Sequence, residues 1–72
     1  MNNILEDIAV IINREYPKKF KTKLEFAAAA DVEETTIRRV LKGEQNLSLK
    51  LLQQICNAID IKLADLFTEI GC

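Results

Sequence analysis

The 72-residue chain is predicted to fold as one compact all-α domain of five helices. Apolar residues recur at helical spacing in five segments, and a capping residue, Pro or Gly stands at the ends of these segments. No window alternates apolar and polar residues over enough positions to propose a strand. The chain has no repeat, linker or low-complexity segment, so residues 1–72 are predicted to form a single domain.

The first helix is predicted to begin at a cap on Asn2 or Asn3 and to end near Arg14 or Glu15. Pro17 ends it, because the residue before a proline avoids the helical region. Its inward face is expected to be an apolar stripe of Ile4, Leu5, Ile8, Ile11 and Ile12.

The segment 22–43 is predicted to contain the second and third helices, joined by a tight turn. Thr22 caps the second helix, and Glu25 three residues later completes a capping box. Asp31 ends this helix, since Asp tolerates the left-handed conformation better than most residues, and Val32 is expected to pack into the core across the turn. The inward side of the second helix is expected to consist of Leu24, Phe26, Ala27 and Ala30.

The third helix is predicted from about Glu34 to Lys42, with Gly43 in the C-terminal stop position. Its core-facing residues are expected to be Ile37, Val40 and Leu41. Its outer side is polar and basic and carries Thr35, Thr36, Arg38 and Arg39. Two short helices this close together, the second with such an outer side, are how a small protein places a helix in the DNA major groove. Residues 22–43 therefore predict a helix-turn-helix and sequence-specific DNA binding.

A fourth helix is predicted from a cap at Ser48 through Ile59, with Asp60 after it. Its core stripe is expected to be Leu51, Leu52, Ile55, Cys56 and Ile59. A short last helix precedes Gly71 and presents Leu63, Leu66, Phe67 and Ile70. These apolar residues have two interpretations: the last helix closes the core of the monomer, or Leu66, Phe67 and Ile70 supply a dimer contact.

The charges are distributed unevenly, although the net charge is −1. Residues 14–42 contain eight basic and five acidic side chains, whereas the rest of the chain has two basic and six acidic ones. A basic middle with acidic ends suits a domain that presents one face to phosphate. Alternatively, these charges are solvated helix faces. Phe20, the one aromatic in the basic loop of residues 18–21, is expected to pack into the core rather than stack on a base.

The composition argues against several other classes of protein. There is no histidine, and two thiols cannot close a four-ligand zinc site, so no metal is expected. Cys56 is expected to be a core residue and Cys72 to be exposed.

No glycine-rich phosphate loop or nucleophile elbow is present, and a core this small should leave no room for a pocket of about 300 Å³, so neither an enzyme, a cofactor nor a small-molecule ligand is expected. The longest apolar runs are five residues and the N-terminus is acidic, which predicts a cytoplasmic protein without a membrane span.

Residues spread over the segment 22–67 form a recognisable pattern, which consists of Thr22, Phe26, Ala27, Val32, Thr36, Ile37, Val40, Gly43, Asn46, Ser48, Leu49, Leu52, Ile55, Ala58, Ile59, Asp65, Leu66 and Phe67. On these residues, the segment resembles the lambda-repressor-like helix-turn-helix domain of the Xre/Cro-C1 type. The resemblance implies a five-helix DNA-binding domain of a bacterial or phage transcription regulator, usually a dimer.

The same resemblance implies a set of DNA contacts. One cation inside the second helix, Lys23, would bind a phosphate. The start of the recognition helix, Glu34 and Thr35, would face base edges, and Arg39 one turn later would point the same way. Thr36 and Arg38 would lie beside them, on bases or backbone, and Lys42, Gln45 and Asn46 would follow the sugar-phosphate strand. With the capping residue, the predicted DNA-binding set is Thr22, Lys23, Glu34, Thr35, Thr36, Arg38, Arg39, Lys42, Gln45 and Asn46.

The chain departs from the family pattern at Asp31, where glycine is usual, and at three acidic positions, Glu33, Glu34 and Glu44. Acids at a helix N-terminus stabilise the helix dipole, but near DNA they are repelled unless one accepts a hydrogen bond from a cytosine N4 amine. We therefore expect weak or cytosine-biased binding to double-stranded DNA by a homodimeric regulator. The alternative is a protein-interaction or antitoxin-type module on the same fold.

Overall fold

The computed structural model describes residues 3–71, and within them the all-α prediction is confirmed. No strand occurs in this part of the chain. None of its helices is long and apolar enough to cross a membrane. The elements are α1 (Ile4–Glu15), a 3₁₀ turn η1 (Tyr16–Lys18), α2 (Lys23–Ala30), α3 (Glu34–Leu41), α4 (Leu49–Ala58) and α5 (Leu63–Glu69).

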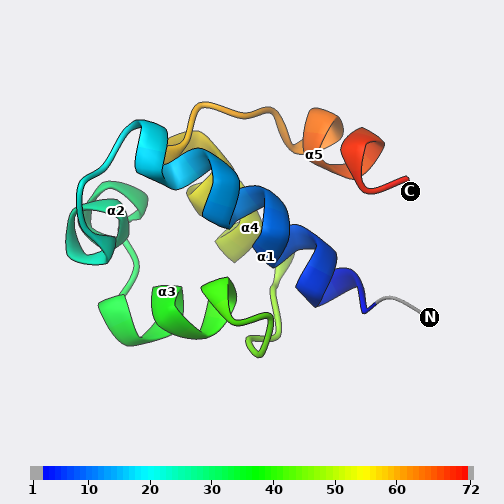
Figure 1. Ribbon diagram of the computed structural model, residues 1–72. Helices are drawn as coiled ribbons and strands as arrows, with labels where there is room; N and C mark the ends of the chain where they lie inside the picture. The colour runs from blue at the N-terminus through cyan, green and yellow to red at the C-terminus, as the bar shows by residue number, and fades with distance from the viewer. Residues whose placement is uncertain (1–2, 72) are drawn as a thin grey trace.

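The five α-helices surround one apolar core (Figure 1). The helix α1 crosses the molecule, α2 and α3 lie together at one side, and α5 lies at the edge opposite α3 (Figure 1). Phe26 is fully buried, and the rings of Tyr16 and Phe20 stack on it with centroids 5.2 and 5.6 Å away. The prediction that Phe20 packs into the core is therefore confirmed. The most deeply buried large side chains are Phe26, Ile12, Ile37, Ile55, Leu66, Val40 and Cys56.

The N-cap residues expected from the sequence begin three of the helices as predicted. The Asn3 side chain accepts a hydrogen bond from the Leu5 N–H at 2.8 Å, while the alternative cap, Asn2, lies outside the described residues. Thr22 and Glu25 form the predicted capping box of α2. Ser48 accepts from the N–H at the third position of α4. Each cap satisfies backbone donors that the first turn of a helix leaves unpaired.

Left-handed backbone at two chain reversals confirms two further predictions. Asp31 follows α2 with φ 60° and Gly43 follows α3 with φ 73°. A side chain at Gly43 would also meet α1, since an added Cβ would lie 3.1 Å from the Cα of Glu6. Gly43 is therefore required both by its backbone conformation and by the close approach of the α3–α4 connection to the first turn of α1.

The structure corrects four details of the sequence analysis. Leu24 is 61% exposed rather than inward-facing, because it lies about 120° around α2 from Ala30, at the centre of the buried face. Ile4, the first residue of α1, is 47% exposed and lies outside the core. The third helix ends at Leu41 and the fourth at Ala58, one residue earlier than predicted in each case.

The predicted core role of Cys56 is confirmed, since the side chain is fully buried. Burial in apolar surroundings raises the pKa of its thiol. The other cysteine, Cys72, lies outside the described residues. Leu66 is also fully buried, and Phe67 and Ile70 pack against the core, so the last helix closes the monomer.

Candidate nucleic-acid interface

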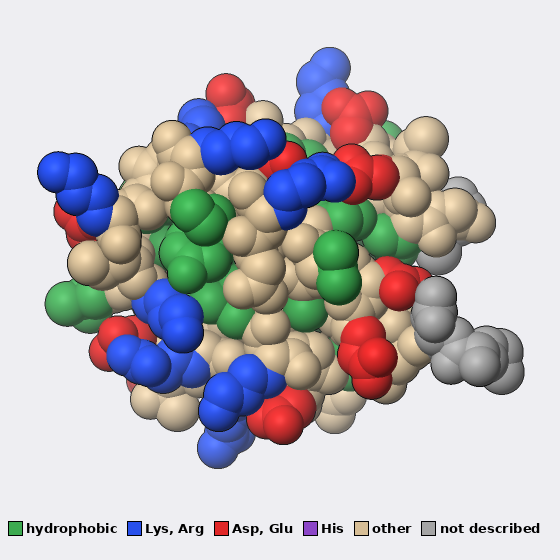
Figure 2. Space-filling model, viewed as in Figure 1, with side chains coloured by type: hydrophobic (Ala, Val, Ile, Leu, Met, Phe, Trp, Pro, Cys, Tyr) green, Lys and Arg blue, Asp and Glu red, His purple; other side chains and the backbone are tan. Residues whose placement is uncertain are grey.

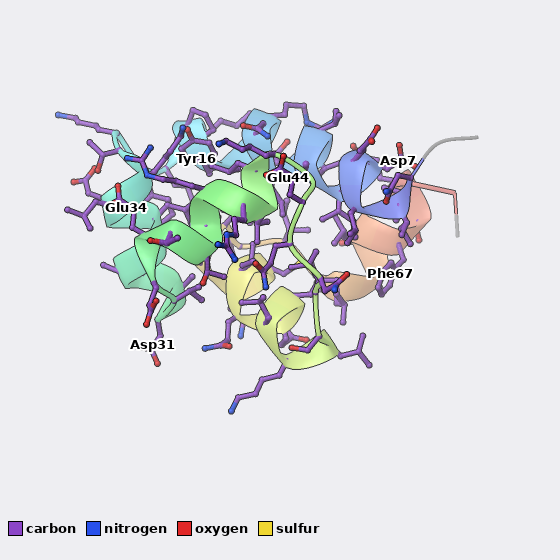
Figure 3. The ribbon with its side chains drawn as sticks, turned by 90° about the horizontal axis from the view of Figure 1, so that it is seen from below. Asp7, Tyr16, Asp31, Glu34, Glu44 and Phe67 are labelled. Carbon is purple, nitrogen blue, oxygen red and sulfur yellow. The ribbon has the colours of Figure 1, made fainter. Side chains whose placement is uncertain are left out.

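The helix α3 presents a polar outer face because its opposite face is anchored in the core. Ile37, Val40 and Leu41 are buried. Thr35, Arg38 and Arg39 are exposed, while Glu34 and Thr36 are half-buried. Viewed from below, α3 lies at the front of the molecule with Glu34 at its beginning and Glu44 beyond its end (Figure 3). The outer face of α3 therefore exposes three of the five predicted contact residues of this helix, and the other two lie at its half-buried margins.

A polar contact with α1 fixes the end of α3. The side-chain amide of Asn13 donates to the backbone oxygens of Ala9 and Leu41, both at 2.8 Å. The Leu41 carbonyl is one of the helix-end acceptors that α3 itself leaves unpaired. The sequence analysis missed this residue. The available signal was an asparagine inside an otherwise apolar helix segment.

An ion pair runs along the beginning of α3. The Arg38 guanidinium donates from Nη2 to Glu34 Oε2 at 2.9 Å, one turn apart. Arg39 and Lys42 are exposed and form no ion pair within residues 3–71. The two predicted cations beyond Arg38 are therefore available to phosphate or bases, whereas Arg38 is already engaged.

At the beginning of α2, most of the polar groups are used to cap the helix. One carboxylate oxygen of Glu25 accepts from the backbone N–H groups of Lys21 and Thr22, at 2.9 and 3.2 Å. Thr22 is used as the cap, through its Oγ1 and the Glu25 N–H. Lys23 is half-buried and forms no ion pair among the described residues. Of the predicted residues in this region, Lys23 is thus the one whose charge remains free.

The loop after α3 carries the last predicted contacts. The Glu44 N–H donates to the backbone oxygen of Arg39 at 3.0 Å, which holds the loop against the helix end. The Gln45 side chain donates to the Asn46 carbonyl at 3.3 Å, and Asn46 is exposed. Lys and Arg side chains gather over the α2–α3 side at the lower left of the molecule, with acidic side chains among them (Figure 2).

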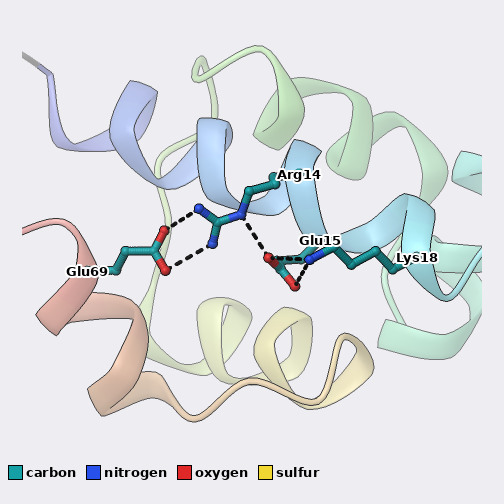
Figure 4. A network of polar contacts seen from close by, with 4 residues as sticks. All are labelled: Arg14, Glu15, Lys18 and Glu69. Carbon is teal, nitrogen blue, oxygen red and sulfur yellow. Dashed lines mark hydrogen bonds and ion pairs between the residues drawn. The ribbon is translucent and has the colours of Figure 1, made fainter.

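A second polar cluster lies away from α3, between α1 and α5. Arg14 forms a two-point ion pair with Glu69, with the shorter contact at 2.6 Å, and also contacts Glu15, which pairs with Lys18 (Figure 4). The hydrogen bonds from Arg14 lower the pKa values of Glu69 and Glu15. This cluster connects the last helix to the first across the surface.

Beneath that cluster, α1, α4 and α5 border an open groove of about 710 Å³. The expectation that so small a core leaves no space of about 300 Å³ is therefore wrong. The groove is floored by the buried side chains Ile11, Cys56 and Leu66 and rimmed by charged ones.

A family model described as a Cro/C1-type HTH DNA-binding domain matches residues 17–70. The chain belongs to this family. Comparison with curated proteins and with solved structures gives no match. The family is a class of DNA-binding domains and not of enzymes, and the matched residues include α2, the Asp31 turn and α3. The predicted resemblance and the predicted fold class are thus both confirmed.

Proposed function

We propose that this Cro/C1-type domain is a sequence-specific DNA-binding transcription regulator whose helix α3 enters the major groove. The observation that carries the proposal is the outer face of α3, which exposes Thr35, Arg38 and Arg39 on a helix fixed to the core and to Asn13. A helix of this kind fits the major groove, where base edges can be distinguished. Arg39 is the side chain best placed for a base, because its guanidinium has no acidic partner within residues 3–71.

Phosphate contacts would come from the residues that flank α3. Lys23 precedes it in the helix-turn-helix, and Lys42, Gln45 and Asn46 follow it. Contacts of this kind orient a protein on the duplex without reading sequence. They also release counterions, so affinity should fall steeply as salt rises.

We further propose that the protein acts as a homodimer formed by single-domain chains of residues 1–72, without a bound small molecule. A domain of this size reads few base pairs, and two copies on half-sites about 34 Å apart would reach useful affinity. Leu66 is buried in the core of the monomer, so it is not available for the dimer contact. Val10 is 66% exposed and borders a shallow depression with Ile70, which makes this part of α1 and α5 the better candidate.

The proposal is tested by selecting bound duplexes from a random pool at low and near-physiological salt. We expect an enriched palindromic motif, and we expect Arg39→Ala to weaken binding to it about tenfold or more. Lys62→Ala is the matched control, since it removes one positive charge at the start of α5, away from α3. If both variants lost the same affinity for the motif, the binding would depend only on overall charge, which would contradict sequence-specific recognition.

The alternative is a protein-interaction or antitoxin-type module with weak or no DNA binding. The acidic residues at the start of α3 and the groove between α1, α4 and α5 favour it. If no motif is enriched and binding disappears at near-physiological salt, the alternative replaces the regulator.

A further inference from the structure

We propose that Arg38 is a positioning residue for Glu34, and that Glu34 reads cytosine through the carboxylate oxygen that Arg38 leaves free. The inference rests on the proposed DNA-binding function of α3. The family resemblance implies only that Glu34 faces base edges and that Arg38 lies beside it, on bases or backbone; the inference gives each of the two a defined role.

The geometry of the pair supports this division. Arg38 Nη2 contacts Glu34 Oε2 at 2.9 Å, and within residues 3–71 no donor is bonded to Glu34 Oε1. The Glu34 side chain is the less exposed of the two, at 36% against 53% for Arg38. One oxygen is thus held and the other remains open, on a carboxylate at the first residue of α3.

The chemistry of the free oxygen selects one base edge. A carboxylate is an acceptor without a donor, and in the major groove cytosine presents its N4 amine as a donor. Guanine presents acceptors at N7 and O6, which would repel the carboxylate, and thymine presents an acceptor at O4. Adenine presents an N6 amine, but its N7 acceptor lies beside that amine and would repel the carboxylate. The same position therefore favours cytosine.

The charge of Arg38 makes a carboxylate tolerable at this place. An unpaired Glu34 would approach the phosphates with a full negative charge. Arg38 is exposed, one turn along the same helix, and lies where it neutralises that charge without covering Oε1. Glu33, the preceding acid, is the N-cap of α3, caps through no side-chain hydrogen bond and has no ion pair among the described residues. It provides an internal comparison for Glu34.

The experiment measures base preference for three single variants, Glu34→Gln, Arg38→Ala and Glu33→Gln, by duplex selection followed by titration on the selected site. A glutamine pairs best with adenine N6 and N7. We therefore expect Glu34→Gln to change one base of each half-site from cytosine to adenine, with a preference of roughly tenfold. Glu33→Gln, which removes the same charge one residue earlier, should leave that base unchanged.

Arg38→Ala should lower the cytosine preference at the same base, and Arg38→Lys should restore part of it because the charge is kept while the planar fork is lost. All the altered side chains are at least partly exposed, and circular dichroism of each variant checks that the helices remain. A purely structural role of the pair would change stability without changing which base is selected.

The inference is overturned if Glu34→Gln and Glu33→Gln raise affinity equally with no change of base, or if Arg38→Ala keeps the full cytosine preference. Either result leaves the proposed function intact, provided that the unaltered protein still selects a motif. Failure of the unaltered protein to select any motif overturns the proposed function and this inference together.

Discussion

The side-chain amide of Asn13 donates to the backbone carbonyl of Leu41 at 2.8 Å, across 28 positions of the sequence. This contact joins the last turn of α1 to the last turn of α3. It supplies a partner to a carbonyl that the end of a helix otherwise leaves to water. The outer face of α3 is therefore held in place by a polar contact as well as by its buried apolar face.

Replacing Asn13 by alanine should destabilise the fold by about 1 kcal/mol, because the Leu41 carbonyl loses its side-chain donor and the Ala9 carbonyl loses a second one. Urea unfolding with a common slope measures the change. Asn57→Ala is the control, since Asn57 only accepts from the exposed Gln53 side chain. A loss for Asn57→Ala as large as that for Asn13→Ala would mean that the link to Leu41 contributes nothing of its own.

Alanine at Gly43 should destabilise the protein by about 2 kcal/mol or more, since the residue has φ 73° and an added Cβ would approach the Glu6 backbone. Gly71→Ala separates the two causes. Gly71 has φ 83° but nothing within 4 Å of an added Cβ, so it reports the backbone cost alone. Thermal unfolding of both variants gives the difference, and equal shifts would argue against a steric role of Glu6.

Leu66→Ala should cost about 2–5 kcal/mol, because the side chain is 1% exposed and its loss opens a cavity beneath α5. Leu24→Ala removes the same atoms from the exposed side of α2 and should change the free energy of unfolding by about 0.5 kcal/mol at most. Denaturant titration of the pair measures both. A small cost at Leu66 would show that α5 adds little to the stability of the core.

The ion pair of Arg14 and Glu69 predicts a pH dependence. The hydrogen bond from Arg14 lowers the pKa of Glu69 in the folded state. Glu69 therefore contributes stability above its unfolded pKa of about 4.3, and this contribution is lost as the pH falls through the lower, folded-state pKa. Glu69→Gln should therefore lower stability slightly at neutral pH and flatten its decline in acid. Unfolding curves from pH 7 to about pH 3 test this. Glu44 forms no ion pair among the described residues, so the stability of Glu44→Gln should still decline in acid as it does in the unaltered protein.

Much of the fold was predictable because local signals carry it. The box of Thr22 and Glu25, the left-handed Asp31 and the stop at Gly43 depend on residue chemistry and short-range geometry, and all three predictions are confirmed. The exposure of Leu24 was not predictable in this way. An apolar residue in an alanine-rich helix fits several inward faces, and the position of Phe26 against Tyr16 and Phe20 decides between them.

Part of the candidate site was likewise predictable from the sequence, and part was not. The polar outer side of α3 follows from helical spacing, so Thr35, Arg38 and Arg39 were identified together on one face. The pairing of Arg38 with Glu34, and the freedom of Arg39, were not predicted from the sequence, although i,i+4 spacing allowed the pair. Helical spacing favours Arg38 over Arg39 as the partner of Glu34, but whether the allowed pair forms depends on side-chain conformation, and the structure decides that.

The sequence by itself determined that this chain forms five helices with a helix-turn-helix at residues 22–43, because spacing, caps and turn residues act over a few positions. The tertiary structure alone decided how α3 is fastened to α1, that Leu66 closes the core, and that α5 leaves a groove beside α4. These features join residues far apart in the chain, and they depend on how the helices pack together in space.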